Sequence, residues 1–356
     1  MLSKYEFMKI LLISPMPPPN GGIGTWTKKY LQHCSAYGIE ADIVNTAVIG
    51  HRGKQLNTKR NLKDEFVRTK TIFRNLKRCL KSNDYDVVHL NTSCDKYGLY
   101  RDFLLCCIVK RKKKKLVIHC RCNLEFQLKT EKRQHIFKKI VKKSDKILVL
   151  NKVSQKFANK YGKDKVVIVP NFIEEGFADE NFQVKKVIKK VIFVGHVQFL
   201  KGFREIYETA RHFCDIDFIL IGPVKEEVLQ LRALPNLIFK GEMEHEKIKK
   251  ELMQADIFLF PSYTEGFANA LLEAMACGLP VIASDAGANA DMIEEKGGKT
   301  VPIGNAEAII SALDEMTELE MRRQMSEWNL RKVNSTYIIP SVMKQLGYLY
   351  SEVIKQ

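Results

Sequence analysis

Short runs of apolar, often β-branched residues recur along the chain, and a helical pattern follows each of them. In the first half the runs occupy residues 9–14, 40–45, 86–91, 115–120, 146–151 and 165–170. The rhythm then restarts with runs at 191–195, 218–222, 236–241, 257–261 and 280–284. Continuous apolar strands that alternate with helices are typical of parallel sheets covered on both faces. The pattern therefore predicts an α/β protein with two doubly wound domains.

The helical segments carry apolar stripes that belong to the core. After the run at 191–195, residues at an i, i+3, i+4, i+7 spacing are apolar or aromatic: Phe203, Ile206, Tyr207, Ala210 and Phe213. The segment after Pro340 is patterned as one amphipathic helix. At 356 residues the chain is long enough for two domains, and we expect them to join near residues 180–190, which include a polar stretch.

Positive charge is concentrated in the first half of the chain. Residues 1–200 hold 41 lysines and arginines against 17 acidic residues, whereas residues 201–356 hold 17 against 24. The basic peak is the "KRKKKK" run at 110–115, and "KKIVKK" follows at 138–143. Such a surface is either a solvated face or a docking site for a polyanion, namely nucleic acid or anionic membrane headgroups.

The chain lacks an apolar run long enough for a membrane span, and prolines interrupt the apolar run near its start, so we expect no signal peptide. The nine cysteines mostly lie within apolar runs. We interpret them as reduced, buried residues, and we do not expect Cys120 and Cys122, the one C-x-C pair, to bind a metal. These features indicate a reducing compartment, most simply the cytosol.

A glycine cluster follows the first predicted strand, in "PMPPPNGGIGTWTKKYL". The spacing of Gly22 and Gly24 lacks the third glycine of a dinucleotide fingerprint, and the run at 40–45 ends without an acidic residue to hold a ribose. A nicotinamide- or flavin-dependent dehydrogenase is therefore disfavoured. What remains is a loop of backbone N–H groups at a helix start, suited to a phosphate, or a plain tight turn.

Ionisable side chains follow two further strands. His196 and Lys201 come after the run at 191–195, and His119 ends the run at 115–120 with Arg121 two residues on. Ligands of open parallel sheets bind beyond the carboxyl ends of the strands. This position favours a functional role over a solvated lysine or a structural histidine, and a cation here could neutralise a diphosphate.

The stretch "EGFANALLEAMACGLPVIAS" at 265–284 contains two carboxylates eight positions apart. We expect Glu265 to lie in a loop, Asn269 to be the N-cap of a helix that ends at Cys277, and Glu273 to lie one turn inside that helix. Both carboxylates can then accept hydrogen bonds from vicinal hydroxyls, while the N–H groups between them suit an anion. This combination fits a molecule with a sugar at each end of a diphosphate.

With these motifs the chain resembles the retaining glycosyltransferases of family 4, the group 1 glycosyl transferases, which have the GT-B fold. The family's E-x7-E element looks like Glu265 to Glu273. "NGGIG" is similar to its first glycine loop, "DVVHLN" and "KLVIHC" to the strands before its acceptor and catalytic loops, "VVIVPNFIE" to its P-N-G-x-D turn, and "VGHVQFLKG" to its G-R-x4-K-G loop. The resemblance runs from Met8 to the C-terminal helix.

The resemblance implies two Rossmann-like domains that face a central cleft. Residues 1–183 would form the acceptor-binding domain and residues 184–335 the nucleotide-sugar-binding domain. Residues 336–356 would form a helix that crosses back onto the N-terminal domain. The implied reaction transfers a sugar from a UDP- or GDP-linked donor with retention at the anomeric carbon, without a cofactor or a metal.

Roles for individual residues follow from the same resemblance. Glu265 would hold donor-sugar hydroxyls near the reacting carbon, with His119 as a second catalytic residue beside the sugar. Glu273 would hold the ribose, and Lys201 would stabilise the leaving diphosphate. Further donor contacts would come from Gly22, Gly24, His196, Gly266, Phe267, Ala268 and Asn269, and acceptor or phosphate contacts from Asn91 and Arg121.

Two positions depart from the family pattern. His196 stands where the family usually has arginine, so phosphate neutralisation is weaker, shared with Arg121 or pH-dependent. Phe172 stands where the P-N-G turn has glycine, which affects the turn alone.

The function predicted from the sequence is transfer of a sugar to a glycan or lipid-linked acceptor in cell-surface polysaccharide synthesis. We expect a cytoplasmic protein whose basic first domain rests on the anionic inner face of the cell membrane. Two alternatives remain open, a sugar-nucleotide epimerase of the same fold and a basic nucleic-acid-binding protein. Because the lysine runs lack interleaved aromatic residues, we do not expect nucleic acid as a partner.

Overall fold

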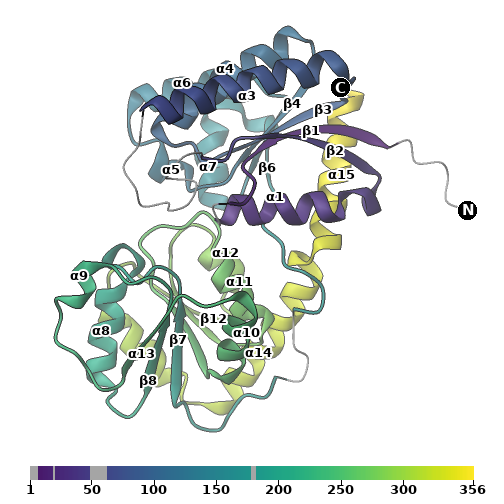
Figure 1. Cartoon of the computed structure of the whole chain (residues 1–356). Helices are drawn as coiled ribbons and strands as arrows, with labels where there is room; N and C mark the ends of the chain where they lie inside the picture. The colour runs from purple at the N-terminus through teal and green to yellow at the C-terminus, as the bar shows by residue number, and fades with distance from the viewer. Residues whose placement is uncertain (1–6, 19–20, 49–61, 178–181) are drawn as a thin grey trace, which may run out of the picture. The chain divides into compact units, whose positions relative to one another are not determined.

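The computed structural model describes residues 7–18, 21–48, 62–177 and 182–356 (Figure 1). Residues 1–6, Asn20 of the glycine motif and residues 180–181 of the expected connection lie outside the described residues. The chain divides into two compact units. The first unit comprises Met1–Phe172 together with Ile339–Gln356, and the second comprises Ile173–Ile338.

The first unit is built on a parallel six-stranded sheet in the order β2-β1-β3-β4-β5-β6. The predicted apolar runs form these strands to within two residues at each end. Their bounds are β1 (Met8–Ser14), β2 (Ile39–Asn45), β3 (Val87–Thr92), β4 (Lys115–Cys120), β5 (Lys146–Val149) and β6 (Val166–Ile168).

Helices cover both faces of this sheet because alternate strand residues point to opposite sides. Leu11 and Ile13 of β1 belong to the core under α3 (Leu62–Ser82), α4 (Lys96–Arg111), α6 (Glu131–Lys143) and α7 (Lys152–Gly162). Ile10 and Leu12 belong to the core under α1 (Gly22–His33) and α15 (Ile339–Lys355). Figure 1 shows α15, the last helix, lying against the first unit as the resemblance implied. A short helix, α5 (Leu124–Gln127), follows β4.

The second unit has its own parallel six-stranded sheet, in the order β12-β11-β10-β7-β8-β9. Counted from β7, this is the 3-2-1-4-5-6 order of dinucleotide-binding domains. The strands are β7 (Lys190–Val194), β8 (Asp217–Ile221), β9 (Leu237–Gly241), β10 (Ile257–Phe260), β11 (Val281–Ser284) and β12 (Gly298–Val301). The short, largely polar β12 was not predicted.

The helices of the second unit confirm the apolar stripe read from the sequence. Phe203, Ile206, Tyr207 and Ala210 are all buried in α8 (Phe203–His212), and Phe213 follows the end of that helix. α8 packs on α13 (Ala306–Glu315), and α11 (Asn269–Ala276) packs on α14 (Leu319–Lys332). The remaining helices are α9 (Glu226–Leu229), α10 (His245–Gln254) and α12 (Asn289–Ile293).

Within the described ranges, none of the helices combines the length and the apolar character that crossing a bilayer requires.

Candidate functional site

The strand order of the second unit locates a candidate site. β7 pairs with both β8 and β10, so the connections that leave β7 and β10 diverge to opposite sides of the sheet. In sheets of this order, ligands bind beyond the carboxyl ends of the two central strands. The loop after β7 carries His196 and Lys201, and the loop after β10 carries Glu265. The strand order therefore brings together loops 60 or more residues apart in sequence.

The two loops are in direct backbone contact. Gly202 adopts a φ of +81°, and a Cβ there would lie 2.2 Å from the Pro261 carbonyl oxygen. The Tyr263 N–H also donates to the Leu200 carbonyl at 3.1 Å. Only glycine fits this close approach in a left-handed conformation. The residue that follows Lys201 is thus fixed by the loop that carries Glu265.

Lys201 and Glu265 form an ion pair. Lys201 Nζ donates to Glu265 Oε1 at 2.5 Å, and the two side chains are 23% and 11% exposed. The backbone of Glu265 also lies close to Gly287, where a Cβ would be 1.9 Å from the Glu265 carbonyl oxygen. The carboxylate and the ammonium therefore meet at the switch point of the sheet, partly shielded from water.

The second carboxylate has its own partner. Glu273 lies in α11 and contacts Nε2 of His245 through its Oε1 atom at 2.9 Å. His245 is the first residue of α10, and its ring packs on Phe177 with centroids 5.3 Å apart. Each acidic residue of the E-x7-E element thus pairs with a basic side chain from another segment of the same unit.

The helix that carries Glu273, α11, begins one residue before the predicted position. Ala268 is the N-cap of α11, because its carbonyl already accepts the N–H of Leu272 at 3.1 Å, and its side chain cannot cap the helix. Asn269 is the first helical residue, so its prediction as the N-cap was wrong. Gly266 and Asn269 are half-buried, whereas Phe267 and Ala268 are buried, with the Phe267 ring against Tyr337.

His196 reaches solvent in the loop after β7. Partial desolvation, followed by the nearby charges of Lys201 and Lys225, lowers the pKa of this histidine. His196 therefore carries less positive charge at neutral pH than a freely solvated histidine.

In the first unit, the glycine motif is the start of a helix rather than a loop. Gly22 and Gly24 are the first and third residues of α1, and Gly21 is its N-cap. Gly24 is buried against the ring of Pro17, where a Cβ would lie 3.4 Å from Cδ. The helix therefore begins within the motif, at Gly22.

A buried polar chain links the carboxyl ends of β1 and β3. Asn91 Nδ2 donates to Ser14 Oγ at 2.9 Å, and Ser14 Oγ lies 2.5 Å from Thr27 Oγ1. The Oδ1 atom of Asn91 is buried without a hydrogen-bond partner. The order of this sheet reverses at β1 and β3, and ligands of open parallel sheets bind beyond the carboxyl ends of such strands. Asn91 is therefore a candidate for ligand contact.

Arg121 and His119 lie side by side after and within β4. The Arg121 guanidinium stacks on Trp26 at 4.4 Å, donates to Asn171 Oδ1 at 2.5 Å and lies 3.1 Å from His119 Nε2. Burial lowers the pKa of Arg121 to about 9, which leaves it charged at neutral pH. The His119 ring has no exposed surface, and burial, then the charge of Arg121, holds its pKa well below the usual value.

Three residues around His119 and Arg121 were not identified from the sequence: His89, Trp26 and Tyr350. His89 Nδ1 lies 2.5 Å from the Tyr350 hydroxyl, and the His89 ring is 5.4 Å from that of His119. Trp26 contacts both histidines and also Phe172, which replaces the glycine of the family turn and is buried. The link from β3 to α15 spans 261 residues, so local patterns could not reveal it.

The part of the chain that the structure describes was searched for a metal site. That part contains no group of three or more His, Cys, Asp or Glu side chains arranged to hold an ion. Cys120 and Cys122 are both free thiols.

Two units, each with a parallel six-stranded sheet and a switch point that carries polar side chains, define a GT-B protein. A search of solved structures agrees. The HepE protein of Anabaena, in complex with UDP and glucose, has a TM-score of 0.73, with 15% sequence identity over 97% of this chain and 100% of that one. At this identity the likeness concerns the fold alone.

Family models identify the chain more closely. Residues 20–176 match the model "Glycosyltransferase Family 4", and residues 174–332 match "Glycosyl transferases group 1". The chain therefore belongs to the family 4, group 1 glycosyl transferases.

Curated relatives match over part of their length. An uncharacterized 41.2 kDa protein in the cps region of Klebsiella pneumoniae is 24% identical over 258 residues, covering 67% of this chain and 72% of that protein. TuaC of Bacillus subtilis, provisionally named a teichuronic acid biosynthesis glycosyltransferase, is 25% identical over 190 residues. That match covers 50% of this chain and 48% of TuaC, about half of each. These comparisons do not support the epimerase or nucleic-acid-binding alternatives.

Proposed function

We propose that this protein is a retaining, metal-independent glycosyltransferase that uses a UDP- or GDP-linked sugar as donor. Its acceptor is a glycan or a lipid-linked intermediate of a cell-surface polysaccharide, at the cytoplasmic face of the membrane. The proposal agrees with the UDP and glucose present in the HepE complex and with the biosynthetic role in the name of TuaC.

The observation that carries the proposal is the Lys201–Glu265 ion pair at the switch point of the second unit. A bound diphosphate competes with Glu265 for the Lys201 ammonium, because it carries more negative charge. Once Lys201 turns to the diphosphate, Glu265 is released to accept hydrogen bonds from donor-sugar hydroxyls. The pair thus keeps both groups neutralised until the donor binds.

Glu273 is suited to the ribose of the donor. Its carboxylate, 18% exposed, holds His245 at 2.9 Å, and vicinal hydroxyls can take the place of the imidazole. The segment of Gly266, Phe267, Ala268 and Asn269 lies between the two carboxylates. We assign it to the donor pocket, because α11 starts here with no side-chain cap and its first N–H groups suit an anion.

In the first unit, Arg121 is the strongest candidate for an anionic group. Arg121 is 9% exposed, and its guanidinium contacts neutral groups, Trp26, Asn171 and His119. A buried cation with neutral partners gains most from an incoming anion. We assign Arg121 and Asn91 to contacts with a phosphate of the acceptor or the donor. We assign the helix start at Gly22 and Gly24 to the same phosphate.

His119 stays in the proposal as a catalytic residue, with one condition. Because its ring is fully buried beside Arg121 and Trp26, contact with a sugar requires Arg121 to move first. Charge that develops on the leaving diphosphate would be stabilised by the Lys201 ammonium, which takes the place that a metal ion would otherwise have.

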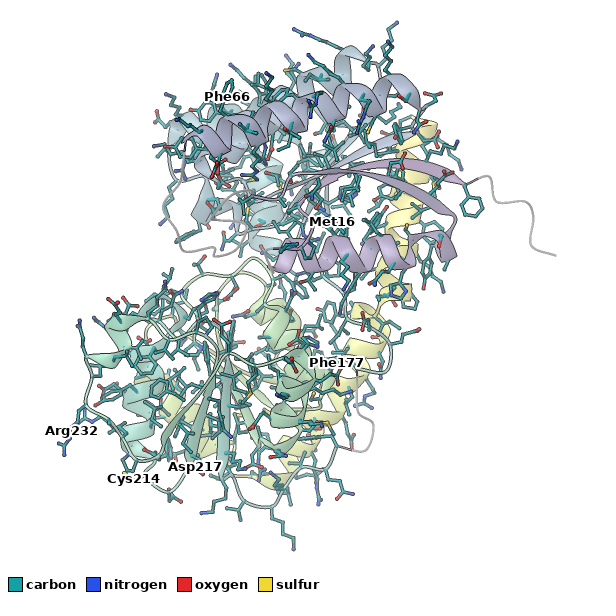
Figure 2. The ribbon with its side chains drawn as sticks, in the orientation of Figure 1. Met16, Phe66, Phe177, Cys214, Asp217 and Arg232 are labelled. Atoms are coloured by element: carbon teal, nitrogen blue, oxygen red, sulfur yellow. The ribbon has the colours of Figure 1, made fainter. Side chains whose placement is uncertain are left out.

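A mixed basic and apolar surface supports membrane docking of the first unit. α3 carries seven lysines and arginines, and its Phe66 and Val67 are 71% and 53% exposed (Figure 2). On α4, which packs against α3, Tyr97 and Leu104 are 60% and 51% exposed. Basic residues beside exposed apolar ones suit an anionic bilayer, where charges attract and apolar side chains insert.

A transfer assay tests the reaction. Nucleotide sugars are first screened for thermal stabilisation of the full chain, and the stabilising donor is then incubated with candidate acceptors. The anomeric configuration of the product, read by NMR, tests retention. Glu265→Gln should lower transfer by about 100-fold or more, on the scale of lost transition-state stabilisation, whereas the exposed Glu295→Gln control should keep the wild-type rate. Near-normal transfer by Glu265→Gln would remove this carboxylate from the mechanism.

Vesicle sedimentation tests the docking surface. Binding should require anionic lipid and weaken as salt rises. Phe66→Ser should reduce binding, while Tyr348→Ser, on the 78% exposed tyrosine of α15, serves as the matched control. Equal binding to neutral vesicles would contradict electrostatic docking.

A further inference from the structure

Tyr263 connects three segments of the second unit and lies two residues before Glu265 in the chain. Its N–H donates to the Leu200 carbonyl at 3.1 Å, and its hydroxyl donates to Glu205 Oε1 at 2.7 Å. Gly304, which follows β12, adopts a φ of +74°, and a Cβ there would lie 3.0 Å from the Tyr263 hydroxyl. The hydroxyl therefore lies against both α8 and the turn that precedes α13.

Glu205 is an unusual residue for the buried side of a helix. It is the third residue of α8, and a glutamate in the first turn of a helix is commonly a solvated charge that the helix dipole favours. Glu205, however, is 6% exposed. Its Oε2 atom is buried and has no hydrogen-bond partner within the part of the chain that the structure describes. Burying a carboxylate with one oxygen unpaired is destabilising, so stability alone does not account for this residue.

The contact fixes the orientation of the Tyr263 side chain. The hydrogen bond to Glu205, followed by burial, raises the pKa of Tyr263, so its hydroxyl remains a donor at neutral pH. A hydrogen bond to a charged acceptor is about twice as strong as one between neutral groups. The Glu205 carboxylate therefore anchors the ring of Tyr263, and with it the start of the loop that leads to Glu265.

The same two segments are joined a second time by the Lys201–Glu265 ion pair. Lys201 lies four residues before Glu205, and Glu265 lies two residues after Tyr263. The proposed function requires this ion pair to break, because Lys201 turns to the diphosphate of the donor. The Tyr263–Glu205 hydrogen bond involves neither of the two groups that separate, so it persists after the ion pair is lost.

We propose that Tyr263 and Glu205 are positioning residues that hold the Glu265 carboxylate in place for the donor sugar once Lys201 has left it. The inference rests on the proposed function and adds these two residues to it. Glu205 is too deeply buried to contact the sugar, and Tyr263 acts through the loop that it anchors. Without the hydrogen bond the loop is less ordered when the sugar arrives, and ordering it on binding weakens the affinity for the sugar.

Calorimetry with the full chain tests the proposal. The probes are UDP-glucose with UDP and GDP-mannose with GDP, and the pair that the wild type binds is used. Tyr263→Phe keeps the ring and removes the hydroxyl. We expect it to weaken binding of the nucleotide sugar by about 3- to 10-fold, on the scale of one hydrogen bond. Its affinity for the free nucleoside diphosphate should be unchanged, because Lys201 and Glu273 are intact.

Three further variants separate positioning from stability. Glu205→Gln keeps an oxygen acceptor and should bind the nucleotide sugar as the wild type does. Glu205→Met removes the acceptor, so it should match Tyr263→Phe in affinity, yet it should keep the wild-type urea midpoint because the unpaired Oε2 is also removed. Tyr207→Phe is the matched control. The Tyr207 hydroxyl, also on α8, donates to the Arg232 carbonyl at 3.0 Å, so this variant should lose stability without losing affinity for the sugar.

Two results would overturn the proposal. One is equal affinity of Tyr263→Phe and the wild type for the nucleotide sugar. The other is an equal loss of affinity for the nucleotide sugar and the free diphosphate, which would mean that the contact supports the folding of the whole site. Failure of the proposed function gives a different result, since the wild type would then bind none of the four probes and the inference would fall with it.

Discussion

His89 makes the stability of the first unit depend on pH. Its ring is fully buried between β3 and α15, where Tyr350, Tyr30, Trp26, His119 and Arg121 surround it. Burial, and then the positive charge of Arg121, lowers the pKa of His89 from 6.5 to about 3. The folded unit therefore keeps this ring neutral throughout the range in which an unfolded chain protonates it.

The sign and size of the effect follow from this difference. Between pH 6.5 and about 3 the unfolded state binds a proton that the folded state does not, so the free energy of unfolding falls as the pH falls. Between pH 7.5 and 5 the loss is about 2 kcal/mol, because 1.5 pH units below 6.5 correspond to about 1.36 kcal/mol each. The full loss, reached near pH 3, is about 5 kcal/mol.

Urea unfolding at pH 7.5 and at pH 5 measures this loss of unfolding free energy. A Trp328→Phe background leaves Trp26 as the single tryptophan, so fluorescence reports the first unit. His89→Gln retains a polar side chain for Tyr350 but does not titrate. Relative to this variant, the wild type should lose about 2 kcal/mol more on going from pH 7.5 to 5. His135→Gln, at an exposed position of the same unit, is the control for the loss of a histidine. Equal pH dependence of wild type and His89→Gln would refute the reasoning.

Three further outcomes are expected. Glu273→Ala should weaken binding of the free nucleoside diphosphate by about 10- to 100-fold, on the scale of lost charged hydrogen bonds; unchanged affinity in calorimetry would exclude the carboxylate from the ribose site. Gly202→Ala should lower the free energy of unfolding of the second unit by about 2–4 kcal/mol, because its Cβ meets the Pro261 carbonyl in a left-handed conformation; in a Trp26→Phe background, a chemical melt with wild-type midpoint would contradict this. Leu346→Ala should cost the first unit about 2–5 kcal/mol, since Leu346 is fully buried, and a smaller loss in the urea assay would show that α15 packs loosely.

The sheets were predictable because their strands are buried on both faces. Eleven apolar runs gave eleven strands, since a strand covered by helices on each side needs apolar residues at every position. β12 was not predicted from the sequence because Gly298–Val301 contains one large apolar residue, Val301. Its strand conformation comes from pairing with β11, where Ile282 lies opposite Lys299, and this tertiary contact overrides the weak local preference.

The candidate site was predictable as a set of loops, but its pairings were not. The sequence indicated that Lys201 and Glu265 each follow a strand, whereas their contact depends on β7 and β10 being neighbours, which strand order alone decides. The burial of the two histidines also came from partners beyond local reach, since Trp26 contacts His119 and Tyr350 contacts His89 from helices at opposite ends of the chain. Spacing predicts which residues reach an edge of a sheet, and packing decides which of them meet.

The path of the backbone has a consequence for biosynthesis. α15 covers one face of the first sheet with Val342, Met343, Leu346 and Tyr350, and the ribosome makes these residues only after the whole of the second unit. Until then the core around Ile10, Leu12 and Val117 has α1 on this face of the sheet but lacks the side chains of α15. The second unit can fold during translation, whereas the first unit keeps apolar surface exposed until α15 has been synthesised. Chaperone demand and the damage done by premature stop codons should therefore fall on the half of the protein that is translated first.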